Sequence, residues 1–249
     1  MHTALRLGWL EVKLLLREPL TVVFSLVLPL IVLFVLGGVF GNEPSKPGEM
    51  VVYRGVGPIT YYVPAYVALV VASVCVISIP THLATNRERG VLKRYHASGI
   101  SAASIAGAEL VVVFALSAIS AALLLVAAWI SYDFESPRSV PAVVGVFIVL
   151  ALGFAAFGLL LGALAPTARA AQALGMLLWF VMLFLGGAGP PPEVLGGAMH
   201  VVSVVTPLLH AVRIMQSAWL GLDAGWSWLV FGGMFAVCTV LGIRLFRWE

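Results

Sequence analysis

The sequence predicts an all-α polytopic membrane protein, with six transmembrane helices, an N-terminal interfacial helix and an outer re-entrant helical hairpin, in one domain of residues 1–249. Of the 249 residues, 61% are hydrophobic and 10% are charged, whereas a soluble domain carries about 25% charged residues. The charges are clustered, and the charge-free stretches between them approach or exceed the roughly 20 apolar residues that cross a bilayer. These stretches are residues 19–42, 55–86, 110–132, 139–168, 170–192, 194–212 and 224–243.

Residues 1–18 are expected to form a helix that lies in the membrane interface. At helical spacing, Arg6, Lys13 and Arg17 fall within a narrow arc, and apolar side chains lie beside them. A basic arc next to an apolar surface is typical of interfacial amphipathic helices.

Six membrane-spanning helices follow. The first apolar run is too long for the core of a signal peptide and has no clear cleavage site after it, so we expect it to be retained as a helix. The six helices are expected at residues 20–40, 60–82, 108–132, 141–165, 170–189 and 225–244.

The basic residues predict the orientation of these helices. With the N-terminus in the cytoplasm, ten Lys and Arg residues lie on the inner side and four on the outer side, which agrees with the positive-inside rule. We therefore expect a multi-pass protein of the cell membrane with both termini in the cytoplasm. The inner residues are Arg6, Lys13, Arg17, Arg87, Arg89, Lys93, Arg94, Arg169, Arg244 and Arg247, and the outer ones are Lys46, Arg54, Arg138 and Arg213.

Residues 190–222 are expected to form a re-entrant or interfacial hairpin at the outer face rather than a seventh span. The prolines from Pro190 to Pro192 interrupt the preceding helix, and Pro207 divides the next apolar stretch into two pieces that are each too short to cross. Irregular backbone at membrane depth has to be sheltered by protein or by a cavity. His210 and Arg213 would lie in this hairpin.

The sequence carries no signature of covalent catalysis. It lacks the G-x-x-x-x-G-K-[ST] phosphate-binding loop, so the chain is not expected to bind ATP itself, and it lacks the H-E-x-x-H and C-x-x-C patterns of metal sites. We therefore expect no cofactor and no metal on this chain. The basic residues lie in short loops and form no stripe, so nucleic acid is not an expected partner. Cys75 and Cys238 both lie in apolar runs, and we expect no disulfide.

Proton-coupled transport would require ionisable residues inside the spans. The candidates are His82, at the inner end of the second helix, and Glu109, at the start of the third. Both lie near an interface, where a solvated or snorkelling side chain is the preferred explanation, so coupling to an ion has little support from the sequence.

Residues 84–101 form a dense charged segment at the predicted inner face. A simple topology signal would need only basic residues, yet here Val91, Leu92 and Tyr95 are interleaved at helical spacing. This pattern predicts a short amphipathic helix against which another protein docks.

Three strings of the sequence stand out by their order. They are E-R-G-x-L-K-R from Glu88 to Arg94, A-P-T-A-R-A-A-Q-A between the fourth and fifth helices, and G-G-A-G-P-P-P followed by V-V-T-P-L-L-H-A-V-R-I. In this order they resemble the ABC-2 type permease family, and in particular its daunorubicin-resistance-like drug exporters. One departure is Gly186–Gly187, where many relatives carry Ser-Gly.

The resemblance implies a membrane subunit that pairs with a second permease, either a copy or a paralogue, and with two ABC ATPase subunits that carry ATP and Mg. It implies that residues 1–18 are the connecting helix and that 190–213 are the outer hairpin. The segment that couples to the ATPase would comprise Arg87, Glu88, Arg89, Gly90, Lys93 and Arg94.

The expected function is ATP-driven export of a hydrophobic or amphipathic substrate, a drug or a lipid, as in antibiotic efflux. A secondary transporter or drug/proton antiporter is the alternative, and an intramembrane enzyme is a weaker one because no suitable nucleophile and base are present. The sequence leaves open the substrate, the pairing of permeases, and alternating access against a lateral path. Two G-x-x-x-G pairs, Gly37 with Gly41 and Gly158 with Gly162, could mark association faces, although chance spacing also explains them in a chain with 25 glycines.

Overall fold

We examined a computed structural model of the chain, which describes residues 23–43, 52–99, 101–132 and 134–245. The predicted interfacial helix at residues 1–18, with Arg6, Lys13 and Arg17, lies outside these described residues. All regular elements of the described part are helical, and five helices are long and apolar enough to cross a membrane, or six if one bent pair counts as a span. The five are Pro58–Glu88, Ser104–Ser131, Val140–Leu164, Ala168–Leu185 and Ser227–Leu245.

A helix of 31 residues, Pro58–Glu88, forms the centre of the bundle. It consists of α4 (Pro58–Ser73), the π-helical turn η3 (Val74–Ser78) and α5 (Ile79–Glu88). Every residue of α4 and η3 is buried, as expected of a helix that is apolar on all sides. The helix extends beyond the predicted 60–82, so the charged segment begins inside it.

Two hydroxyl groups in the middle of this central helix hydrogen-bond within the helix. Ser73 Oγ donates to the carbonyl of Leu69 at 2.6 Å, and Thr81 Oγ1 donates to the carbonyl of Ile77 at 2.7 Å. Both bonds join residues four apart, a common way for Ser and Thr to satisfy their hydroxyls inside a helix.

The other spanning helices surround this centre. They are α7 (Ala102–Ser131), α8 (Val140–Leu164), α9 (Ala168–Leu185) and α12 (Ser227–Leu245), together with η1 (Val23–Val27) and α3 (Leu28–Phe40). A helix is thus present at each of the six predicted positions, but the first, described from Val23, has an apolar part, Val23–Val39, that is shorter than the five helices long enough to cross a membrane.

Two further helix ends differ from the prediction by four residues or more, for local reasons. The third helix starts at Ala102 rather than 108, because Ser101 Oγ accepts a hydrogen bond from the backbone N–H of Ser104 and caps the helix. The fifth ends at Leu185 rather than 189, because Gly187 adopts a positive φ of 79°.

Glycines allow α8 and α9 to approach the central helix closely. A Cβ atom on Gly158 of α8 would lie 2.2 Å from the carbonyl oxygen of Cys75, and one on Gly175 of α9 would lie 2.5 Å from that of Val76. Gly162 likewise faces Leu83 and Pro80. The G-x-x-x-G pair at Gly158 and Gly162 therefore packs inside the chain, and an association face is not needed to explain it.

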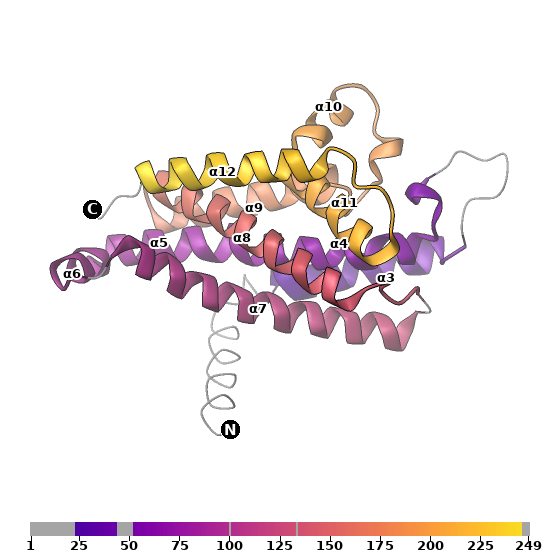
Figure 1. Cartoon of the computed structure of the whole chain (residues 1–249), viewed down its shortest axis with the longest axis horizontal. Helices are drawn as coiled ribbons and strands as arrows, with labels where there is room; N and C mark the ends of the chain where they lie inside the picture. Colours follow the sequence, from indigo (N-terminus) through magenta and orange to yellow (C-terminus); the bar gives the residue numbers. More distant parts are fainter. Residues whose placement is uncertain (1–22, 44–51, 100, 133, 246–249) are drawn as a thin grey trace, which may run out of the picture.

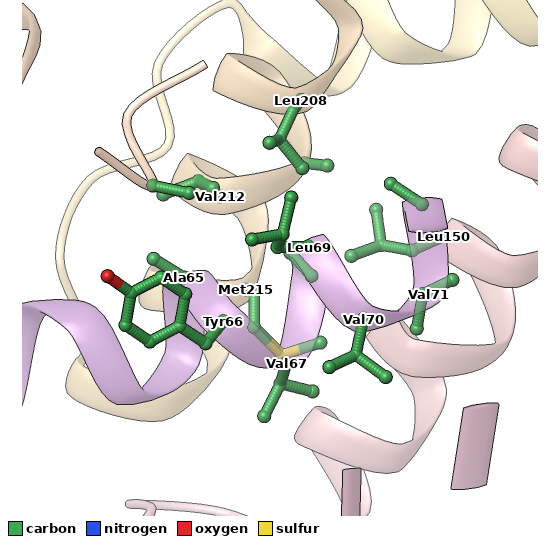
Figure 2. Packing of buried hydrophobic residues seen from close by; sticks show 14 of the residues in the cluster. Ala65, Tyr66, Val67, Leu69, Val70, Val71, Leu150, Leu208, Val212 and Met215 are labelled. Atoms are coloured by element: carbon green, nitrogen blue, oxygen red, sulfur yellow. The ribbon is translucent and has the colours of Figure 1, made fainter. Parts of the chain in front are cut away.

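The buried core continues between α4 and α11 (Pro207–Leu220). Figure 2 shows Leu208, Val212 and Met215 of α11 directed towards α4 around Leu69. Leu69, Leu208 and Met215 have no exposed surface. In a membrane such contacts stabilise through close packing, since lipid tails are as apolar as these side chains.

The two ends of the bundle differ in charge. The short helix α6 (Val91–Ala97) lies at the same end as the last turn of α12, and α10 (Gly197–Val205) lies towards the other end (Figure 1). We call these the basic end and the hairpin end. Among the described residues the basic end holds Arg87, Arg89, Lys93, Arg94, Arg169 and Arg244, and the hairpin end holds Arg54, Arg138 and Arg213.

Candidate functional site

At the basic end, the chain turns sharply between α5 and α6. The α5 helix ends at Glu88, Gly90 adopts a left-handed conformation with φ 66°, and α6 begins at Val91. Glycine tolerates this φ without steric cost, which explains its place between the two helices. The short helix predicted within residues 84–101 is therefore present.

The α6 helix is anchored by one side chain. Leu92 is completely buried and packs in a cluster with Leu83 and Ile105. Val91 is half-buried, whereas Tyr95 is 40% exposed. Of the three apolar residues that were expected to form one face, Leu92 faces the bundle and Tyr95 faces outward.

The candidate coupling residues divide into two groups. Arg89, Lys93 and Arg94 are exposed and lie on the outer surface of the turn and of α6. Arg87 is half-buried and Glu88 is exposed, but both side chains also contact the turn between α8 and α9.

Arg87 and Glu88 bind opposite ends of that α8–α9 turn. Arg87 Nη1 donates to the carbonyl of Gly162 at 3.1 Å, and Arg87 Nη2 donates to the carbonyl of Ala165. Glu88 Oε1 accepts a hydrogen bond from the backbone N–H of Ala168 at 2.9 Å. The last carbonyls and first N–H groups of a helix have no partner within it, and these two side chains supply partners to both.

His82 and Glu109 are brought together near the basic end. His82 Nδ1 lies 3.6 Å from Glu109 Oε2, which joins α5 to α7, and the pair is ionic only when the histidine is protonated. The two side chains are 33% and 14% exposed. This arrangement places the two ionisable candidates from the sequence at one position.

The segment after α9 enters and leaves the bundle at the hairpin end. After η4 (Pro192–Val194), the helices α10 and α11 meet at Pro207 with a bend of 70°. Tyr62 Oη donates to the carbonyl of Gly189, and the backbone N–H of Arg138 donates to the carbonyl of Trp219, so both ends of the segment lie beside residues of the hairpin end. The break predicted at Pro207 is present, and the path is that of a re-entrant hairpin.

Of the other predicted hairpin residues, Pro190 is half-buried and Pro192 is buried. His210, on α11, is 4% exposed and connects three helices. Its Nε2 lies 2.8 Å from the carbonyl of Val204 on α10, and its Nδ1 lies 3.3 Å from Ser227 Oγ on α12. Because a carbonyl can only accept, Nε2 carries the proton and the Ser227 hydroxyl donates to Nδ1. The imidazole thus holds the bend in place.

A second polar group at the hairpin end was not recognised from the sequence. Gln216 of α11 is completely buried; its Oε1 accepts from Arg54 Nη1 at 3.1 Å, and its Nε2 donates to the carbonyl of Tyr61 at 3.2 Å. Arg54 also donates to the carbonyl of Asp223. Burial, and then the positive charge of the half-buried Arg213, lower the pKa of Arg54. The sequence feature that could have identified this group is a glutamine inside a mostly apolar helix.

Within the described residues, no group of three or more His, Cys, Asp or Glu side chains could hold a metal ion. Cys75 and Cys238 are both free thiols, as expected from their apolar surroundings.

Comparison with protein-family models places most of the chain in a known family. Residues 4–220 of the chain match the family model described as ABC-2 type transporter. A search of curated proteins finds no match. The matched range contains the central helix, α6, the α8–α9 turn and the hairpin through α11.

Proposed function

Because the chain belongs to the ABC-2 type transporter family, we propose that it is the membrane subunit of an exporter that moves a hydrophobic or amphipathic molecule, such as a drug or lipid, out of the cell. Membership makes it a permease subunit, whose family relies on a separate ABC ATPase subunit. In this proposal ATP and Mg are held by two such ATPase subunits, and the chain pairs with a second permease, a copy or a paralogue.

Coupling to the ATPase is supported by the surface of α6. Arg89, Lys93 and Arg94 are exposed there, and Leu92 fixes the helix on the bundle beneath them. A rigid basic surface fits an acidic groove on a partner, and complementary charges steer association and fix its register. This is the observation on which the proposal chiefly rests.

An apolar substrate is supported by the surfaces of the outer helices. Of an 18-residue apolar stretch in each helix, only 28% is buried within the chain in α9 and 11% in α12. These helices therefore present apolar surface to lipid, to a second permease or to a passenger that partitions into the membrane.

The proposed orientation has the basic end in the cytoplasm of a cell whose plasma membrane the bundle crosses. It is supported by the six basic residues at that end against three at the hairpin end, counted over the described residues. Short loops rich in Lys and Arg remain on the cytoplasmic side.

The alternative is a proton-coupled antiporter, which the His82–Glu109 pair favours. Ionisable groups between helices are frequent parts of proton relays. The two functions differ in their source of energy, so one reconstitution separates them.

The experiment is export of daunorubicin and of a fluorescent phospholipid by proteoliposomes that contain the chain with the ABC ATPase that co-purifies with it. We expect export to require ATP and to continue when the proton gradient is collapsed. Export by the chain alone, driven by a pH gradient, would establish the antiporter. Failure to export either probe with ATPase bound would refute the proposed substrate class.

A charge reversal tests the role of α6. Arg94→Glu should reduce ATPase co-purification, because a like charge placed against an acidic groove costs several kcal/mol. Arg138→Glu is the matched control, since Arg138 is also an exposed arginine but lies at the hairpin end. Equal co-purification of the two variants at equal expression would contradict the docking role.

A further inference from the structure

The turn between α8 and α9 has few hydrogen bonds of its own. Pro166 lies in it and has no N–H, Ala165 N–H bonds the carbonyl of Leu161, and Thr167 Oγ1 accepts from the N–H of Ala170. The carbonyls of Gly162 and Ala165 and the N–H of Ala168 are the groups that Arg87 and Glu88 satisfy. The position of this turn is thus set from outside it, by the end of α5.

The charges of the two side chains suit the helix ends that they contact. The guanidinium of Arg87 lies at the C-terminal end of α8 and the carboxylate of Glu88 at the N-terminal end of α9. A cation at a helix C-terminus and an anion at an N-terminus both interact favourably with the helix dipole. If Arg87 and Glu88 were interchanged, each helix end would face a charge of the unfavourable sign, so the order of the two residues matters for both interactions.

The helices α5 and α8 also pack tightly just below the turn. Gly162 of α8 lies against Leu83 and Pro80 of α5, where a Cβ atom would come within 2.9 Å of Leu83 Cδ2. Close packing of this kind transmits displacement rather than absorbing it, since protein interiors have low compressibility. Hydrogen bonds at the turn and packing beneath it therefore join α5, α8 and α9 into one unit at the basic end.

We propose that Arg87 and Glu88 are positioning residues that make the α8–α9 turn move together with α6. Displacement of α6 by the ATPase then reaches α8 and α9 directly, as well as α5. The inference rests on the proposed function, since it needs an ATPase docked at α6, but it assigns Arg87 and Glu88 to transmission and leaves docking to Arg89, Lys93 and Arg94.

The first test measures one distance in two states. Spin labels are attached at Ser98→Cys and Arg169→Cys, both at exposed positions, in a Cys75→Ala, Cys238→Ala background of the chain bound to its ATPase. Double electron–electron resonance should give the same distance distribution in the nucleotide-free and ATP-bound complex. A distribution that shifts between the two states would overturn the inference, because the turn would then move independently of α6.

The second test removes the contacts. Glu88→Ala should reduce substrate-stimulated ATP hydrolysis about fivefold, the factor that corresponds to loss of a helix cap worth about 1 kcal/mol. ATPase co-purification should remain, and the label distribution should broaden. Glu88→Gln keeps an oxygen that can accept from Ala168 and should restore most of the stimulation, which a loss of folding would not explain.

Glu43→Ala serves as the control, because Glu43 is an exposed carboxylate outside this turn. If substrate stimulates ATP hydrolysis as strongly in the Glu88→Ala variant as in the Glu43→Ala variant, the positioning role is wrong. If no ATPase co-purifies with the unmodified chain, the proposed function itself fails. The two failures are therefore distinguishable.

Discussion

Substitution of Gly158 by alanine tests the packing at the centre of the bundle. The new Cβ atom would lie 2.2 Å from the carbonyl oxygen of Cys75 and 3.2 Å from Ile79 Cβ, both on the central helix. The 2.2 Å contact is with backbone, so α8 has to shift to relieve it. Overpacking of this kind typically costs about 1 to 3 kcal/mol.

Gly145, in the same helix, is the matched control. No atom lies within 4 Å of a Cβ built there. Both substitutions gain the roughly 1 kcal/mol by which alanine favours a helix over glycine, so the difference between the variants isolates the steric cost of about 1 to 3 kcal/mol. At about 2 to 4 °C per kcal/mol for a chain of this size, the two midpoints of thermal unfolding should differ by about 2 to 12 °C.

The assay is thermal unfolding of the purified protein in detergent, followed by the fluorescence of its seven tryptophans. Gly158→Ala should melt below Gly145→Ala. If Gly158→Ala melts at the same temperature or higher, α8 does not pack on Cys75 as described. If it instead changes the oligomeric size without changing the midpoint, the glycine belongs to an association face.

Three further predictions concern the hairpin end and the orientation. Gln216→Leu removes the acceptor of the Arg54 Nη1 group and should lower stability by about 1 to 3 kcal/mol in the same thermal assay; an unchanged midpoint would contradict the network. His210→Phe removes the contact across the bend with Val204 and the contact with Ser227 of α12, so backbone hydrogen exchange in α10 should become faster, and unchanged exchange would show that the imidazole does not hold the bend. A cysteine at Ser136 should react with an impermeant thiol reagent outside intact cells and one at Ser98 should not, whereas reaction at Ser98 would reverse the orientation.

The membrane helices could be predicted from the sequence because hydrophobicity is the main constraint on a bilayer-spanning segment. The break at Pro207 was predictable for a similar reason, since proline lacks the N–H that continues a helix. The ends of the helices could be predicted less accurately from the sequence. The start of α7 depends on the cap from Ser101, a local contact that hydropathy does not contain.

The roles of Arg87, Glu88 and Gln216 could not be derived from the sequence. Arg87 bonds carbonyls of Gly162 and Ala165, far along the chain, and only the packing of α5 on α8 brings them within reach. In the sequence, Arg87 and Glu88 stand in a basic cluster, and the family resemblance assigns both to the segment that couples to the ATPase. The structure instead gives them a part in holding the α8–α9 turn, so their replacement is not a test of docking alone.

The central helix also bears on the order in which the bundle is assembled during synthesis. It is made before α8, α9, α11 and α12, which later cover it. Its long apolar part carries no charged side chain, and Ser73 and Thr81 bond to carbonyls of their own helix, so these two hydroxyl groups need no partner from the later helices. Gln216 has no such local partner and bonds to Arg54 and Tyr61, which the ribosome has already released. The central helix can therefore enter the bilayer before the helices that cover it are made. The helix α11, which contains the buried Gln216, is made after the residues to which this glutamine bonds.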